Sequence, residues 1–229
     1  MIIDNSDWTR IFLVYGIQLI LGIFFFYFGI LIIKRNQNRI GRSLGCFYIT
    51  IAGAAFLNAL LILIRSNPAA FLLYFLILYL GFFSHSFLVI FIRNLGQTNP
   101  NGFKILIGYA LITFIILLYP EGFEYNKHTN WRPTFAFYFS ILLILYYTFL
   151  LLIPILYYSK KVYNSFMDAL LKQQLKYFLT GVLCLSFMFY GLLFYVFWDN
   201  YIYRIIWSFL AFLSIPSGFL IYYGIGRKI

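Results

Sequence analysis

The chain has 229 residues, of which 63% are hydrophobic and only 10% are charged, whereas a soluble domain usually carries about 25% charged residues. A soluble fold of this length cannot bury so much apolar surface, because small domains leave much of their surface in water. The net charge of +11 would suggest a nucleic-acid partner in a soluble protein. Here its meaning depends on where along the chain the charges lie.

Seven apolar stretches are long enough to cross the hydrocarbon core of a membrane, which takes about 20 residues in a helix. In chain order they cover residues 11–33, 44–64, 69–92, 103–119, 134–158, 177–198 and 202–225. Their apolar runs are continuous, which favours helices over the alternating strands of a barrel. We therefore expect an all-α integral membrane fold, a seven-helix bundle that forms a single domain over residues 1–229.

The residues before the first predicted span do not resemble a cleavable signal. Asp4 and Asp7 stand where such a signal is basic, and the apolar run behind them is long enough to span a membrane. We expect this run to be the first helix of the bundle.

Basic residues are divided unevenly between the two sets of connections that alternate along the chain. One set, with the C-terminal residues, contains twelve Lys and Arg and a single acidic residue, Asp168. The other set, with the N-terminal residues, contains five basic and five acidic residues. Because basic connections stay in the cytoplasm, we expect a multi-pass protein of the cell membrane with its N-terminus outside and its C-terminus in the cytoplasm. The excess charge then indicates topology and contact with anionic lipid head groups, and we expect no nucleic-acid partner.

Gln18 in the first predicted span and Asn58 in the second lie at matching depth, each about 10 Å below the outer surface by helical rise. They could hydrogen-bond to each other and tie the two helices together, or they could face a central cavity together with Tyr15. The small residues around Asn58 favour close packing of the second span. We prefer the structural role and keep all three side chains as candidate ligand contacts.

His85, in the run Ser84-His85-Ser86, is the one ionisable side chain other than tyrosine deep within a predicted span. An imidazole there could be a proton-sensitive switch, a ligand contact, or a metal or haem ligand. The lack of a second ligand at matching depth argues against haem. A neutral His85 that hydrogen-bonds to a neighbouring Ser or Tyr is the favoured interpretation, and we keep Ser84 and His85 as candidate ligand or switch residues.

Chemistry that relies on charged or metal-ligating groups is not indicated within the spans. None contains Asp, Glu or Lys in its middle, which disfavours proton- and cation-coupled transport. Cys46 and Cys184 both fall within predicted spans, and we expect them to pack as small apolar residues. Because no zinc ligand set, carboxylate pair or nucleophile–base pair is visible, we expect no metal, no cofactor and no enzymatic activity.

Residues 120–133 form the one outer connection long enough to make a lid or a small binding surface. They include Glu121, Glu124 and His128 as potential metal ligands and Trp131 as an interfacial aromatic residue. We expect a solvated loop that is anchored by Trp131.

Residues 159–176 form a basic amphipathic connection on the inner side. Apolar residues recur there at the spacing of one helical face, and the other positions are mainly basic or polar. We expect a helix that extends the fifth span or lies in the interface. Four of its lysines are candidates for contact with anionic lipid or for relay to a cytoplasmic partner: Lys160, Lys161, Lys172 and Lys176.

Pro154 in the fifth span and Pro216 in the seventh are candidates for helix kinks, because proline removes a helical hydrogen bond. A kink permits part of a span to move as a rigid body.

The predicted topology, the segment LKQQLKYFLTGVL at residues 171–183 and the ending IYYGIGRKI at residues 221–229 resemble the N-terminal seven-helix sensor region of membrane histidine kinases. In that family a basic segment commonly leads into the sixth helix, and the last helix ends in small residues and Tyr. The family continues into dimerisation, sensor and ATP-binding modules. This sequence contains no phospho-accepting His region and no nucleotide-binding Gly-rich segment, so we expect a stand-alone sensor module or a truncated one.

We therefore expect a receptor-like membrane sensor that binds a small or apolar signal and relays it to a cytoplasmic signalling protein. The alternative is a small transporter or permease for a neutral or lipid-like substrate that passes Gln18, Asn58 and His85. A homodimer is compatible with both. A continuous polar path through the bundle would favour transport, whereas a closed outer pocket would favour sensing.

Overall fold

The protein is helical almost throughout, apart from one short hairpin. The computed structural model describes residues 16–35, 38–61, 63–64, 66–96, 102–126, 128–129, 132–198 and 200–226. In chain order its elements are α2 (Gln18–Arg35), α3 (Arg39–Leu61), α4 (Asn67–Gly96), α5 (Gly102–Leu117), β1 (Phe123–Glu124), β2 (Thr134–Phe135), α6 (Phe137–Tyr146), the π-helical segment η2 (Tyr147–Leu152), α7 (Ile153–Ser165), α8 (Ala169–Phe197), α9 (Tyr201–Leu210), the 3-10 segment η3 (Ala211–Leu213), α10 (Ser214–Ile221) and the π-helical segment η4 (Tyr222–Gly226). The all-α fold expected from the sequence is confirmed.

Within the described ranges, six helical stretches are long and apolar enough to cross a membrane. They are Gln18–Arg35, Arg39–Leu61, Pro68–Gly96, Phe137–Ser165, Ala169–Phe197 and Ile205–Ile225. The predicted span at residues 103–119 forms α5, which has 16 residues, fewer than the roughly 20 that a full crossing takes. The described helices therefore indicate a multi-pass membrane protein.

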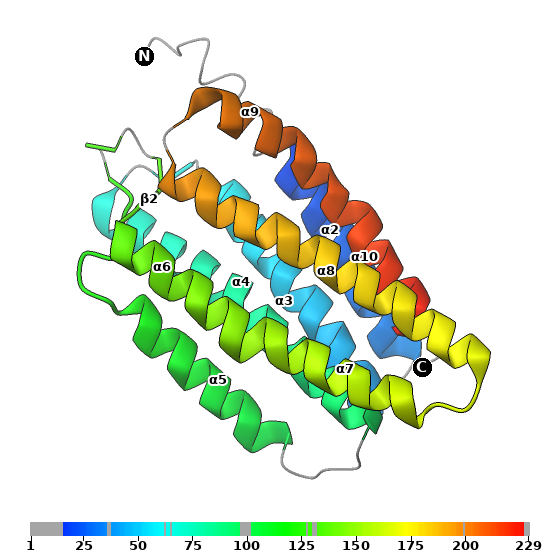
Figure 1. Ribbon diagram of the computed structural model, residues 1–229. Helices are drawn as coiled ribbons and strands as arrows, with labels where there is room; N and C mark the ends of the chain where they lie inside the picture. Colours follow the sequence, from blue (N-terminus) through cyan, green and yellow to red (C-terminus); the bar gives the residue numbers. More distant parts are fainter. Residues whose placement is uncertain are drawn as a thin grey trace.

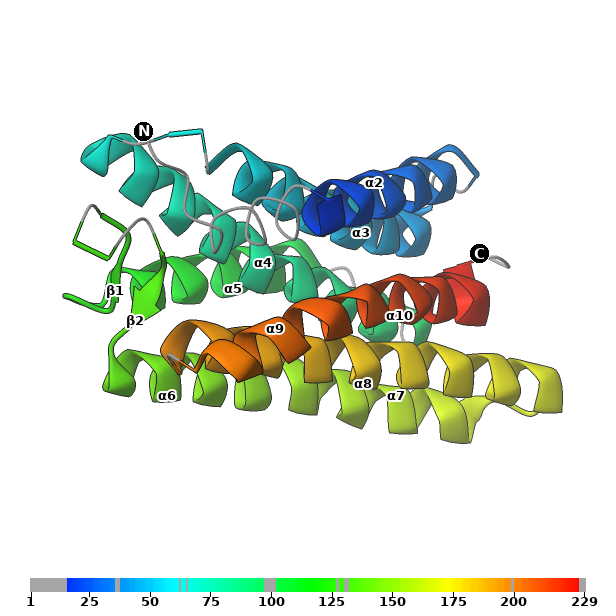
Figure 2. The same ribbon diagram turned by 90° about the horizontal axis from the view of Figure 1, so that it is seen from above.

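The long helices lie side by side, so the bundle has two distinct ends (Figure 1). The hairpin end carries β1, β2 and the starts of α6 and α9. The opposite end, here called the basic end, carries the turn between α7 and α8 together with Lys34 and Arg35 at the end of α2. Seen from above, α2 and α3 lie on one side and α6, α7 and α8 on the other, with α4 and α10 between them (Figure 2).

Several element boundaries differ from those expected. Residues 11–15 of the first predicted span lie outside the described residues. The helix expected over residues 159–176 is confirmed at residues 159–165, which extend the fifth span, and at residues 169–176, which begin α8, but residues 166–168 between them are not helical. The break has a local cause: Asp168 is the N-cap of α8, and its Oδ1 accepts a hydrogen bond from the Leu170 backbone N–H at 2.8 Å.

Both prolines predicted to kink a helix follow a segment that is not α-helical. Pro154 follows η2, and Pro216 follows η3. A proline ring clashes with the carbonyl four residues earlier, which belongs to Leu150 for Pro154 and to Phe212 for Pro216. Each carbonyl lies in the irregular segment, so the departure from α-helical geometry accommodates the proline.

Toward the basic end, the interior is filled by large apolar side chains. Those that are essentially inaccessible include Leu44, Phe47, Tyr48, Leu88, Phe91, Ile92, Leu151, Ile155, Phe178 and Ile221. The Tyr48 hydroxyl donates a hydrogen bond to the Gly218 carbonyl oxygen at 2.6 Å, which joins α3 to α10. These side chains fill the half of the interior toward the basic end, and the cavity lies in the other half, nearer the hairpin.

Candidate ligand-binding cavity

A cavity of about 300 Å³ lies in the half of the bundle nearer the hairpin. Its lining along α4 runs from Tyr74 to His85, and along α8 from Leu185 to Val196, so it extends about 16 Å along the bundle at 1.5 Å per helical residue. Side chains of α2, α3, α9, η3, α10 and the hairpin complete a wall that is mainly aliphatic and aromatic. Small-molecule sites typically have such walls, with a few polar groups that orient the ligand.

His85 lies at the inner end of the cavity and is the lining residue of α4 farthest from the hairpin. Its side chain is only 1% exposed. Aromatic rings surround it: the ring centroids of Tyr147 and Phe189 each lie 5.0 Å from that of the imidazole, and the centroid of Phe47 lies 6.0 Å away. The polar group at the cavity floor is therefore set in apolar surroundings.

Hydrogen bonds within α4 assign the tautomer of His85. Nδ1 lies 3.0 Å from the Gly81 carbonyl oxygen and 3.2 Å from Ser84 Oγ. The Ser84 hydroxyl itself donates to the Gly81 carbonyl at 2.7 Å. Because a carbonyl oxygen only accepts, this arrangement assigns the proton to Nδ1 and makes Nε2 an acceptor.

Nε2 of His85 is buried and has no hydrogen-bond partner among the described residues. A buried acceptor left unpaired costs about 1–3 kcal/mol, so a ligand that offers a donor to this atom gains an additional favourable interaction. The atom has almost no accessible surface. A donor therefore reaches it only when a neighbouring side chain moves.

Gln18 on α2 and Asn58 on α3 both line the cavity. No hydrogen bond joins their two side chains, which belong to the described part of the chain, so the interhelical tie preferred from the sequence is not formed. The cavity instead brings Gln18, Asn58 and His85 together on one surface. Tyr15, the fourth candidate contact, lies outside the described residues.

Ser84 and the two candidate kink prolines are not among the residues that line the cavity. Ser84 is fully buried, and its hydroxyl is used within α4. Pro154 and Pro216 act on the backbone around η2 and η3, and only the second of these segments contributes to the wall, through Ala211.

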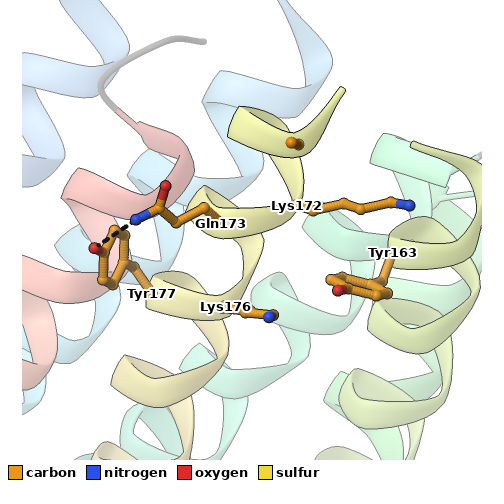
Figure 3. Close-up of a pocket in the computed structure, with 6 residues that line it drawn as sticks. Tyr163, Lys172, Gln173, Lys176 and Tyr177 are labelled. Carbon is orange, nitrogen blue, oxygen red and sulfur yellow. Dashed lines mark hydrogen bonds between the residues drawn. The ribbon is translucent and has the colours of Figure 1, made fainter. Parts of the chain in front are cut away.

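The four candidate lysines lie at the basic end, away from the cavity. Lys160 and Lys161 are exposed on α7. Lys172 and Lys176 on α8 line a separate surface pocket with Tyr163 of α7 (Figure 3). The structure therefore separates the four lysines into two pairs with different surroundings.

The described part of residues 120–133 is not wholly the solvated loop that the sequence suggested, because Phe123 and Tyr125 are buried and Tyr125 and Pro133 line the cavity. β1 pairs Phe123 with Phe135 of β2, and the side chains of Phe123 and Tyr125 are buried. The Tyr125 ring stacks on that of Tyr74, with centroids 5.6 Å apart. Alternation places these aromatic side chains on the inner face, as expected for a strand buried on one face.

The polar residues of this connection face away from the cavity or lie outside the described residues. The Asn126 side-chain oxygen accepts a hydrogen bond from the Thr129 backbone N–H at 3.0 Å, which closes a local turn. Glu121, Glu124 and His128 are exposed. Among the described residues, no three His, Cys, Asp or Glu side chains form a group that could hold a metal. Trp131 lies outside the described residues.

Sequence reasoning missed most of the aromatic wall. Trp207 of α9 lines the cavity and packs over Gly191 of α8, where a Cβ would lie 1.5 Å from the indole ring. Tyr74 of α4 lines the cavity together with Tyr125 and Phe135 of the hairpin. In a chain that is 24% aromatic, single aromatic residues carry little signal. The alternation of Phe123, Glu124 and Tyr125 was the local cue for a strand with one buried face.

Comparison of the chain with protein-family models, curated proteins and solved structures finds no match.

Proposed function

We propose that the protein is a receptor-like sensor of the cell membrane, with seven spans, that binds a small, largely apolar molecule in the cavity. In this proposal α5 is the fourth of the seven crossings. Its side chains support contact with lipid, because Phe103, Leu111 and Ile115 are 73%, 57% and 64% exposed. The clustering of Lys and Arg at the basic end supports a cytoplasmic location for that end.

The observation that carries this proposal is the position at which the cavity ends. It begins below the hairpin and stops at His85. Beyond His85, the described interior toward the basic end is occupied by large buried side chains, among them Phe47, Tyr48 and Leu88. A pocket that ends inside the bundle supports sensing, whereas a transported substrate needs a path to the other side.

The few polar groups on the wall suggest the chemistry of the ligand. The amides of Gln18 and Asn58 line the cavity on α2 and α3, and His85 offers an acceptor at the floor. The remaining lining is mainly apolar. We therefore propose a ligand with an apolar body and one hydrogen-bond donor, such as an aliphatic alcohol or a phenol.

We further propose that the signal passes from His85 through Tyr147 into α7. Tyr147 begins η2, which continues into α7 and reaches the basic end at Ser165. The Tyr147 ring stacks on that of Phe189, with centroids 4.5 Å apart. A donor that approaches Nε2 of His85 displaces one of these rings, and Tyr147 is the one that belongs to the η2–α7 helix.

The resemblance of residues 171–183 to the sensor region of membrane histidine kinases supports a cytoplasmic signalling partner. This segment lies in α8 and begins close to the turn that joins α7 to α8. A movement of α7 would therefore reach the segment that carries the resemblance.

The test compares two probes that differ only in a donor: a bromine-labelled aliphatic alcohol and the bromoalkane of the same length. Quenching of Trp207, which lines the cavity, reports binding when the other tryptophans are replaced by Phe and the protein is held in a lipid bilayer. After correction for partition into lipid, we expect the alcohol to bind about five- to tenfold more tightly, the value of one hydrogen bond.

His85→Phe should abolish the preference for the alcohol because it removes the acceptor and keeps a ring. His128→Phe is the matched control, because His128 is exposed outside the cavity, and should leave the preference unchanged. Equal binding of the two probes to the unmodified protein, or a preference that survives in His85→Phe, would refute the proposed recognition.

The alternative function, transport of a neutral or lipid-like substrate, makes a different prediction. Proteoliposomes that contain the protein should then show saturable flux of the same alcohol above that of protein-free vesicles. We expect no such flux, because the buried side chains below His85 obstruct the route to the basic end.

A further inference from the structure

At the basic end, Lys172 and Lys176 of α8 are directed toward one aromatic ring of α7. The ammonium nitrogen of Lys172 lies 5.5 Å from the centroid of the Tyr163 ring, and that of Lys176 lies 5.8 Å from it. Both are within the range in which a cation is attracted to an aromatic face. Their approach to the same ring concentrates positive charge at one place. This is unfavourable by itself, because two positive charges four residues apart on one helix repel each other.

No acidic side chain neutralises this charge within the described part of the chain. Asp168 is the one acidic residue in α7, α8 and their connection. Its carboxylate accepts a hydrogen bond from the Leu170 backbone N–H and caps α8. Within the described ranges, both Lys172 and Lys176 contact the Tyr163 ring.

These side chains line an open pocket over the first turns of α8 (Figure 3). Lys172 and Lys176 extend from α8 toward Tyr163 of α7, whereas Gln173 and Tyr177 extend from the opposite side of α8. The Gln173 side-chain amide donates a hydrogen bond to the Tyr177 hydroxyl oxygen at 3.0 Å. The two ammonium groups beside the Tyr163 ring offer donors to the oxygens of a phosphate group.

The length of α8 places the pocket at the membrane surface. α8 has 29 residues, or about 43 Å at 1.5 Å per residue, whereas a hydrocarbon core is about 30 Å thick. The far end of α8 is apolar through Phe197, so the surplus of roughly nine residues falls at its start, over residues 169–177. Tyr163 and Tyr177 are residues typical of the interface.

We infer that this pocket binds the phosphate of one anionic lipid head group and thereby connects α7 to α8. The inference is independent of the cavity ligand. It differs from general attraction to an anionic membrane, because Lys160 and Lys161 of the same connection are exposed and do not line the pocket.

The test measures how tightly the purified full-length protein retains phosphatidylglycerol, by native mass spectrometry after release from vesicles of phosphatidylglycerol and phosphatidylcholine. The unmodified protein should retain one tightly bound phosphatidylglycerol. Lys172→Gln with Lys176→Gln should weaken this binding by about tenfold or more, whereas the control Lys160→Gln with Lys161→Gln, which removes the same charge, should weaken it less than about threefold. Equal weakening by the two double variants would overturn the inference in favour of diffuse attraction.

Two further measurements separate the sources of phosphate and protect against misfolding. Inorganic phosphate is added as a competitor, and release of the lipid by phosphate at millimolar concentration would assign the pocket to a free anion and overturn the lipid assignment. Tyr177→Phe removes a single hydroxyl at a partly exposed position and keeps both lysines. Because this hydroxyl lies on the side of α8 away from Tyr163, the variant should retain the lipid as tightly as the unmodified protein, and severalfold weaker retention would overturn the assignment of the phosphate to the two lysines.

Discussion

Tyr147 links the floor of the cavity to the packing of two helices. Its side chain is 1% exposed, and its hydroxyl donates a hydrogen bond to Ser186 Oγ at 3.0 Å. The Ser186 hydroxyl donates in turn to the Val182 carbonyl at 2.8 Å within α8. The sequence pointed to His85 because a polar group deep in a membrane span is rare. It did not point to Tyr147, which is one of 21 tyrosines and gains its role from its neighbours.

Tyr147→Phe should lower the free energy of unfolding by about 0.6–1.7 kcal/mol, the measured range for side-chain hydrogen bonds between membrane helices. The change removes the hydroxyl and keeps the ring against His85 and Phe189. Denaturant titration in mixed micelles measures the effect. Tyr157→Phe is the matched control, because Tyr157 is 65% exposed on α7. An equal loss of stability in both variants would contradict the assigned hydrogen bond.

The helices α8 and α10 approach closely where α8 carries glycine. A Cβ on Gly181 would lie 2.7 Å from the Ser217 carbonyl oxygen and 2.9 Å from the Ile221 backbone nitrogen. Small residues permit such close approach between membrane helices.

The apolar runs predicted where the helices lie, because the hydrophobicity of each segment depends on the surroundings of that segment alone. α8 begins at Ala169, earlier than the span predicted at residues 177–198. The polar residues that follow Asp168 interrupt the apolar run by which the span was predicted, so the start of the helix was not recognised although Asp168 is an N-cap residue.

Gly181→Ala should destabilise the protein by about 1–3 kcal/mol, because the atoms that the new methyl group meets are backbone and α10 must shift as a whole. Gly108→Ala on α5 is the control, because a Cβ at that position would meet no described atom within 4 Å. Alanine is a better helix former than glycine, so this variant should be unchanged or slightly more stable. Thermal unfolding of both variants in one detergent checks the prediction, which fails if they behave alike.

The distribution of charge over the whole molecule predicts how the bundle is oriented in the membrane. The end of α2, the start of α3, the end of α7 and the start of α8 carry Lys and Arg at the basic end. Retention of basic connections in the cytoplasm would orient the hairpin and the cavity toward the outside. The net charge of +11 thereby becomes a prediction of sidedness.

Cysteine labelling checks that orientation. In a protein in which Cys46 and Cys184 are replaced by Ser, Lys127→Cys should react in intact cells with a membrane-impermeant maleimide, and Lys160→Cys should react only after permeabilisation. The two positions differ in side because the intervening helices cross the membrane an odd number of times in the proposed topology. The reverse pattern would overturn the orientation, and labelling of both in intact cells would overturn the crossing between them.

Local sequence was sufficient for the helical class and for the approximate positions of six spans, because in lipid each apolar segment must satisfy its own backbone hydrogen bonds. The sidedness stays a prediction from the sequence. The cavity required the packing of segments far apart in the chain. Gln18, Asn58 and His85 meet on its wall together with an aromatic hairpin and Trp207, and their positions depend on how each helix is rotated against its neighbours. That rotation is set by contacts such as Gly181 against Ser217, which a linear pattern of apolar residues does not encode.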